Sequence, residues 1–383
     1  MSNTLTNLIP TIYTAKDIIL RELTGFIPSV TLDASAEMAA KGQTIRFPVV
    51  PALAADDITA AATGPDPSAS TQGNDTMSIS KSRSTTFYWE GEEQKGLGAD
   101  MYRTILANQF AQSMRTLVNE VEADLAALYV TASRAYGTAG TTPFGSSLGD
   151  LAQVLKILQD NGSPTSDLQL VLSTTAGASL RTLAQLSKAN EAGSAELLNR
   201  GTLLDIFGFK VRESAQVKAH TKGTGAGYLV DLTAGYAAGS TTVHVDTGTG
   251  TILAGDILTN TKTGSDTNKY VVKTGFAGNG DGDIVLANPG NKAAWVNNDP
   301  VAVGGSYAAN LAFSRQAIDL VMRVPAMPEG GDSADDVTVV SDEQTGISFQ
   351  VAMYRQRRRV AYEVGLAWGV KAVKPEAIAI LLG

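Results

Sequence analysis

The chain has 383 residues, no cysteine, two histidines and a formal net charge of −8 at neutral pH. The length is enough for about two or three domains. The lack of cysteine excludes disulfides and thiol catalysis and fits a cytoplasmic origin. The acidic balance argues against nucleic-acid binding through the whole surface. No apolar run reaches the ~18 residues of a membrane span, and the N-terminus lacks the pattern of a signal peptide.

The N-terminal quarter predicts elements that reach outward. Residues 1–35 are typical of an arm, with a short helix over Ile9–Leu23. Two alternating runs, Gln43–Val50 and Met77–Trp89, enclose a long polar stretch and predict an extended two-stranded loop over 36–97. Because an isolated two-stranded ribbon is marginally stable, we expect it to lie on a partner surface.

The longest helical pattern runs from Gly98 to Ser133. Roughly 35 residues at a rise of ~1.5 Å give a rod of about 50 Å, which needs packing along its length. Apolar residues at steps of three or four predict one buried stripe. Its members are Leu106, Phe110, Met114, Leu117, Val121, Leu125 and Leu128. Arg103, Arg115 and Glu122 fall off this stripe and are expected on the polar face.

The middle of the chain changes character twice. Helical and strand patterns alternate over 146–225, with strands at Leu168–Leu172 and Phe207–Glu213, which favours a mixed α/β domain. Residues 226–305 are rich in Gly, Thr, Asp and Asn, and short β runs recur between turn residues. This pattern predicts an inserted all-β barrel or sandwich. The expected strands are 228–232, 241–245, 256–259, 269–274, 283–287 and 300–303.

The last segment resumes the α/β pattern. Leu311–Met322 is expected as a helix or an extended segment, and Pro325–Asp336 as a loop. Two long alternating strands then flank a basic turn at Arg355–Arg359, and Ala377–Leu382 forms a final apolar run. The predicted units are 1–35, 36–97, 98–145, 146–225, 226–305, 306–340 and 341–383.

The sequence predicts no catalytic, cofactor or metal site. Lys222–Gly227 is glycine-rich but lacks the order of a P-loop, so we interpret it as a hinge into the insertion. Gly278–Asp283 has a faint likeness to a calcium loop, but its distal Glu is missing and a turn is favoured. His220 and His244 are expected to be ordinary polar residues. The cluster Arg355, Arg357, Arg358 and Arg359 could contact DNA phosphates, although a charged loop or an intersubunit ion-pair site is favoured.

Several short stretches, in this order along the chain, resemble the major capsid proteins of tailed double-stranded DNA phages. They are Gly208–Ser214, Gly255–Leu258, Asn310–Arg315, Gly365–Val370 and Val373–Glu376. The closest likeness is to coat proteins of the short-tailed phage P-twenty-two type, which carry an inserted β-barrel. The resemblance implies an α+β fold of the tailed-phage and herpesvirus capsid class. Its parts are an N-terminal arm, an extended loop, a spine helix, peripheral and axial domains, and the inserted barrel.

The resemblance also implies a function and partners. Pentamers and hexamers would build an icosahedral shell, first as a precursor guided by a scaffolding protein and then expanded as DNA enters. A portal protein and weakly held packaged DNA would be the other partners, with assembly in the host bacterial cytoplasm, no membrane and no cofactor. We hypothesise intersubunit ion pairs between Lys81 or Arg83 and the loop residues Asp56, Asp57 and Asp66. Arg103, Arg115 and Glu122 would then be surface charges of the shell wall.

Three other functions remain open from the sequence. An encapsulin-type nanocompartment would share the core fold, although the insertion disfavours it. A surface adhesin could use the β module for binding, but the expected secretion signal is absent from the N-terminus. An enzyme with a β cap domain would need a nucleophile, a base and an orienting group, which the motifs do not assemble.

Overall fold

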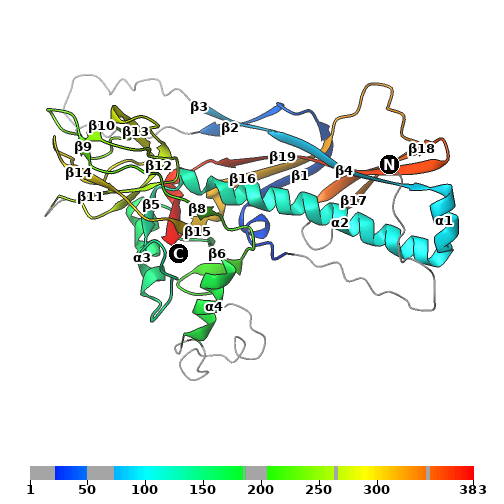
Figure 1. The fold of residues 1–383 in the computed structure, drawn as a ribbon, viewed down its shortest axis with the longest axis horizontal. Coiled ribbons are helices and arrows are strands. Elements are labelled where there is room, and N and C mark those ends of the chain that lie inside the picture. The colour runs from blue at the N-terminus through cyan, green and yellow to red at the C-terminus, as the bar shows by residue number, and fades with distance from the viewer. Residues whose placement is uncertain (1–21, 50–72, 184–185, 187–204, 263–265, 342–345) are drawn as a thin grey trace, which may run out of the picture.

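The structure is a computed structural model that describes residues 22–49, 73–183, 186, 205–262, 266–341 and 346–383. Within these residues the chain forms an elongated body (Figure 1). A β-barrel occupies one end, and the hairpin of β18 (Ser348–Gln356) and β19 (Arg359–Ala372) occupies the other together with helix α1 (Gly91–Leu97). Helices α3 (Gly149–Asp160) and α4 (Thr174–Thr182) project to one side. The expected tip residues Asp56, Asp57 and Asp66 and nearly all of the predicted helix Ile9–Leu23 lie outside the described residues.

The predicted long helix is confirmed in type and position, although it is shorter than expected. It is α2 (Ala99–Ala126), and a 3-10 turn, η2 (Ala127–Thr131), follows it. A short helix, α1 (Gly91–Leu97), precedes α2 and was not predicted. Gly98 joins α1 to α2 with a φ of 75°, a left-handed conformation that favours glycine. At ~1.5 Å per residue α2 is a rod of about 42 Å. Figure 1 shows it running from α1 toward the barrel.

Burial along α2 follows the predicted stripe most closely in its second half. Leu117, Val121 and Leu125 are buried in the main core, while Phe110 and Met114 are partly buried against it. The helix lies across β4 (Lys81–Glu90) and β19 (Arg359–Ala372). This packing removes the apolar face of the long helix from water, whereas the same helix in isolation would leave that face exposed.

A six-stranded sheet lies under α2 in the described residues. Its order is β1 (Thr31–Ala39), β16 (Ile318–Pro325), β19, β18 (Ser348–Gln356) and β17 (Asp336–Ser341), with β4 paired to the other edge of β19. Both closing strands, β18 and β19, are confirmed. Strand β17 was not predicted, and β1 lies partly in the segment expected to be an arm.

The predicted two-stranded loop is confirmed only at its base. Strands β2 (Thr44–Val49) and β3 (Gly73–Ser78) pair antiparallel as a separate ribbon. The returning strand does not continue in the ribbon to Trp89 as expected. Ile79 is buried, and the Ser80 N–H donates to the carbonyl of Trp368 at 3.0 Å, so the chain leaves the ribbon there. Strand β4 then joins the six-stranded sheet by pairing with β19.

A second, larger sheet carries the remaining α/β elements. It includes β5 (Arg134–Tyr136), β20 (Ile378–Leu382), β15 (Tyr307–Ser314), β6 (Leu168–Leu172) and β7 (Phe209–Glu213), with β8 (Ala219–His220) paired to β15. Helices α3 (Gly149–Asp160) and α4 (Thr174–Thr182) pack in the same region. Leu311–Met322 is extended rather than helical, because β15 pairs with β6 on one edge and β20 on the other. Short 3-10 turns are η1 (Ile27–Ser29), η3 (Arg315–Ala317) and η4 (Pro375–Ala377).

The insertion is a closed β-barrel, one of the two all-β architectures that the turn spacing predicted. Its strands are β9 (Tyr228–Val230), β10 (Thr242–Gly248), β11 (Ile257–Asn260), β12 (Lys269–Thr274), β13 (Gly280–Leu286) and β14 (Pro300–Val303). The order β11-β14-β9-β10-β13-β12 closes through pairing of β11 with β12. Tyr228, Tyr270 and Trp295 fill its core. Strand β12 also pairs with β5, which joins the barrel to the larger sheet.

Candidate functional site

A buried carboxylate of α2 holds the N-terminal segment Gly25–Ile27 in place. Glu122 has no exposed surface. It accepts hydrogen bonds from the backbone N–H groups of Gly25, Phe26 (2.7 Å) and Ile27 (3.0 Å). Burial raises the pKa of Glu122, against the opposing effect of these donors. The expectation that Glu122 is a surface charge of a shell wall is therefore wrong, because the N-terminal segment covers this part of the helix.

Arg115 of α2 also binds the N-terminal segment, through Glu22. Its guanidinium makes a bidentate ion pair with Glu22, and the Asn119 amide donates to Glu22 at 2.8 Å. The hydrogen bond from Arg115 is the main cause that lowers the pKa of Glu22 to about 2. Arg103, by contrast, is exposed near the start of α2. Its role in contacts between subunits stays a prediction.

The two cations expected on the extended loop both have partners on α2 of the same chain. The Lys81 ammonium lies 2.7 Å from Asp124, which also accepts a hydrogen bond from the Trp368 indole at 2.9 Å. Arg83 lies 3.5 Å from Glu120. Their expected pairing with a neighbouring subunit stays a prediction, since the acidic tip residues are not described.

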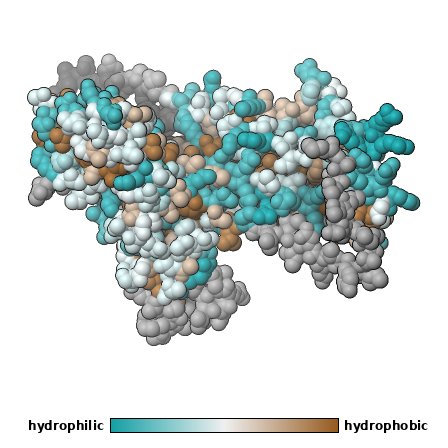
Figure 2. Space-filling view, viewed as in Figure 1, coloured by the Kyte–Doolittle hydropathy of each residue, from teal (hydrophilic) through white to brown (hydrophobic). Residues whose placement is uncertain are grey.

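The basic turn forms the tip of the β18–β19 hairpin. Arg355, Arg357, Arg358 and Arg359 are all exposed there. The Arg359 guanidinium lies 5.1 Å from the ring centre of Tyr88, and Arg358 adopts a φ of 62° in the turn. Figure 2 shows hydrophilic side chains concentrated at this end of the molecule. The tip is a concentrated positive charge, and its contact with DNA or with another subunit stays a prediction.

A buried polar network connects the barrel to the spine. The Nδ1 atom of His220 is hydrogen-bonded to the Tyr129 hydroxyl at 2.9 Å, and its Nε2 atom is hydrogen-bonded to the Asp256 carboxylate at 2.8 Å. Asp256 has no exposed surface and also accepts the backbone N–H groups of Gly223 and Leu253. His220 is thus a structural residue at the hinge, close to its predicted place. Its partners, the partly buried Tyr129 of η2 and the buried Asp256 of the barrel, come from segments that the sequence did not connect.

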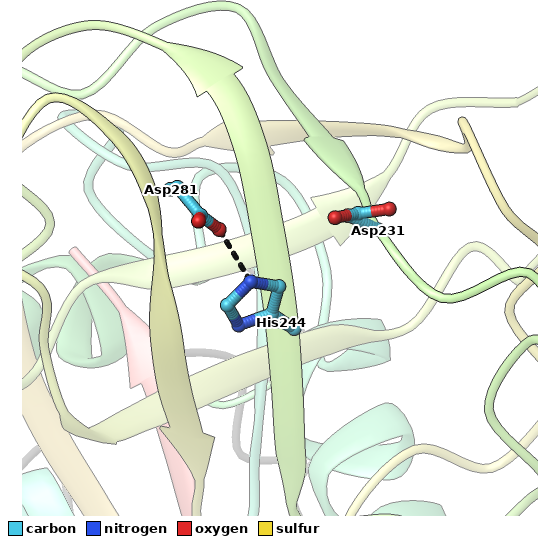
Figure 3. Close-up of side chains that lie close together, drawn as sticks. All are labelled: Asp231, His244 and Asp281. Carbon is cyan, nitrogen blue, oxygen red and sulfur yellow. Dashed lines mark ion pairs between the residues drawn. The ribbon is translucent and has the colours of Figure 1, made fainter.

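The second histidine belongs to an exposed cluster on the barrel. His244 of β10 lies between Asp231, just after β9, and Asp281 of β13 (Figure 3). Its Nε2 atom pairs with Asp281, and its Nδ1 atom lies 2.6 Å from Asp283. The hydrogen bond to Asp283, and then the one to Asp281, raises the pKa of His244. The sequence had singled out Asp281 and Asp283 within a turn, but it had not placed His244 or Asp231 beside them.

Comparison with solved structures shows which fold these parts make up. The chain matches a chain from the capsid of Cyanophage P-SCSP1u with a TM-score of 0.54 and 12% identity, covering 100% of this chain and 95% of that chain. It matches a chain from Mycobacterium phage Che8 with a TM-score of 0.52 and 14% identity, covering 99% of this chain and 98% of that chain. The chain has the tailed-phage major capsid fold.

This assignment confirms the predicted fold class, with helices and sheets mixed and a closed barrel in addition. The narrower likeness to coat proteins of the P-twenty-two type stays a prediction. No protein-family model matches the sequence, and no curated protein matches it either. None of the described helices is both long and apolar enough to cross a membrane.

Proposed function

We propose that this chain is the major capsid protein of a tailed bacteriophage, and that its copies build the icosahedral shell around the double-stranded DNA genome. The strongest support is that this chain shares its fold with chains from phages over nearly the whole length of each compared chain. A structural role without catalysis fits that fold. The finer identification with a P-twenty-two-type coat protein rests on the short sequence stretches and on the inserted barrel.

Exposed sheet edges support a role in self-assembly. Within the described residues, β1 and β17 are edge strands on one side of β19, and β4 forms the edge on the other side. Strand β1 exposes Leu32 and Met38, and β17 exposes Val339 and Val340. Edge strands offer unpaired backbone groups, and exposed apolar side chains favour contact with another surface. In a closed shell, neighbouring copies would cover these edges.

The partners follow from the same proposal. Copies would form pentamers and hexamers, first in a precursor guided by a scaffolding protein and closed at one vertex by a portal protein. Assembly in the host bacterial cytoplasm would precede expansion into the virion capsid as DNA enters. The net charge of −8 supports weak, non-specific contact with packaged DNA.

Electron microscopy of the purified chain tests the proposal. We expect closed shells of uniform size when the chain is expressed with its scaffolding protein. Soluble monomers under all conditions, with or without that partner, would refute it. A shell that encloses protein cargo and excludes DNA would instead identify a nanocompartment.

The basic hairpin tip needs its own test, because it allows two roles. Reversing charge in Arg357→Glu and Arg358→Glu should block shell formation if the tip pairs with another subunit. If the tip contacts DNA, shells should form but the salt dependence of DNA binding should weaken. Lys273→Glu is a matched control, since Lys273 is an exposed cation on the barrel strand β12.

A further inference from the structure

Three neighbouring strands of the barrel bring metal-ligating side chains to one exposed place. Strand β10 lies between β9 and β13, and His244 is the register partner of Asp283. The backbone N–H of Asp231 donates to the His244 carbonyl at 2.9 Å, which fixes Asp231 beside the imidazole. One ligand atom each from Asp231, His244 and Asp281 lie within 4.8 Å of one another (Figure 3). Paired strands therefore hold the backbones of all three.

The imidazole is oriented as a metal ligand would be. Its Nδ1 atom is hydrogen-bonded to Asp283 at 2.6 Å, and its Nε2 atom faces Asp281. A carboxylate on one ring nitrogen fixes the tautomer and aims the other nitrogen, which is the usual surrounding of histidines that bind zinc. The second carboxylate at Nε2 would share the ion. Asp283 is thus a positioning residue, and the ligand atoms would come from His244, Asp281 and Asp231.

The charge of the cluster also favours a cation. Three carboxylates surround one imidazole, and among the described residues none of them forms an ion pair with a lysine or arginine. The Asp281 side chain is 76% exposed and that of His244 is 34% exposed, so an ion can reach them from solvent. The single imidazole offsets only part of the charge of the three carboxylates, and a bound cation would offset the rest.

We propose that this cluster binds one divalent transition-metal ion that accepts mixed nitrogen and oxygen ligands, such as Zn²⁺ or Mn²⁺. Imidazole suits these ions better than it suits Ca²⁺ or Mg²⁺, whereas carboxylates suit all of them. Bonds of ~2.0–2.2 Å place two ligand atoms on one ion at most ~4.3 Å apart. The Asp281 carboxylate, which contacts Nε2 directly, has to move back so that the ion can enter between them, and rotation of its exposed side chain permits this. The proposal does not depend on the capsid assignment.

Metal binding to the full chain tests this site directly. After removal of metal with a chelator, equilibrium dialysis against Zn²⁺ or Mn²⁺ should give one ion per chain. His244→Asn and Asp281→Asn should weaken that binding at least tenfold, and Asp283→Asn should weaken it less. Asp336→Asn is the matched control, because it removes one exposed carboxylate from β17, far from the barrel. All four positions are on the surface, and circular dichroism can establish that each variant is folded.

X-ray absorption by the bound zinc gives a second readout. The chain has two histidines and no cysteine, and both ring nitrogens of the buried His220 already have partners. A spectrum with one imidazole and otherwise oxygen ligands, lost in His244→Asn, would establish the site. Binding that is equal in wild type and His244→Asn, or that is displaced equally well by Ca²⁺, would overturn the proposal. So would the absence of stoichiometric binding.

Discussion

Replacing Glu122 by alanine should destabilise the subunit far more than the same change two residues earlier. The carboxylate accepts three backbone N–H groups from Gly25, Phe26 and Ile27, and it has no exposed surface. Each buried donor left without a partner costs about 1–3 kcal/mol. Since relaxation and water entry recover part of this, we expect Glu122→Ala to lower the free energy of unfolding by about 3–5 kcal/mol. Many domains have ~5–15 kcal/mol in total.

Glu120→Ala is the matched control on the same helix. Its side chain is 36% exposed and lies 3.5 Å from Arg83. Surface ion pairs of this kind contribute about 0–1 kcal/mol. Denaturant unfolding of unassembled subunits would measure both variants, and amide exchange at Gly25, Phe26 and Ile27 would localise the effect. If Glu122→Ala costs no more than Glu120→Ala, the carboxylate does not hold this segment.

The pH dependence of Glu122→Gln gives an independent check. Burial raises the pKa of Glu122, so the folded state binds its proton more tightly than the unfolded state does. The associated stability is fully present below the pKa of the unfolded chain and is lost as the pH rises through the raised pKa. Glutamine does not titrate. The stability of wild type relative to Glu122→Gln should therefore fall as the pH rises through that window, and a constant difference would contradict the reasoning.

Three further predictions concern the spine and the hinge. Val121→Asp places a carboxylate at a fully buried position and should lower the free energy of unfolding by about 5 kcal/mol. Val121→Ala should lower it by about 2–3 kcal/mol. Normal folding of the Asp variant in a thermal melt would disprove the assignment of Val121 to the buried stripe. Because Arg115 lowers the pKa of Glu22 to about 2, the ion pair stabilises the folded state fully above the pKa of Glu22 in the unfolded chain, and this contribution is lost as the pH falls toward 2. In an acid titration, the free energy of unfolding of Glu22→Gln should lack this pH-dependent loss, and an unchanged titration would contradict the role of the pair. His220→Ala breaks bonds to Tyr129 and Asp256 and should cost about 2–4 kcal/mol; hydrogen exchange should rise first in the barrel, and uniform acceleration would contradict a hinge role.

Local patterns in the sequence were sufficient for many elements of the fold. The 3.6-residue period of Leu117, Val121 and Leu125 predicted α2, and the run Leu168–Leu172 coincides with β6. Turn residues at regular spacing predicted the barrel strands. These signals are local because side-chain direction repeats within each helix or strand. The break between β3 and β4 was missed because alternation continues through it, while the cause lies in β19, far along the chain.

The candidate sites depended on contacts that periodicity does not contain. Lys81 and Arg83 were recognised as charges, but their partners on α2 follow from how the helix crosses β4. The calcium-like turn was judged by its own spacing, which lacks the distal ligand. The barrel supplies His244 and Asp231 from other strands, so the cluster exists only after the strands pair.

By itself, then, the sequence determined where the long helix and most of the strands form, that the insertion is all-β, and that a rod of this length must pack along its length. Tertiary structure decided which polar residues are surface charges and which are buried partners. Glu122 shows the reason: its position beside the apolar stripe is the same in any amphipathic helix, and only the segment that folds over it from Gly25 to Ile27 removes it from water. Burial depends on contacts between distant residues, and these cannot be derived from the period of one helix.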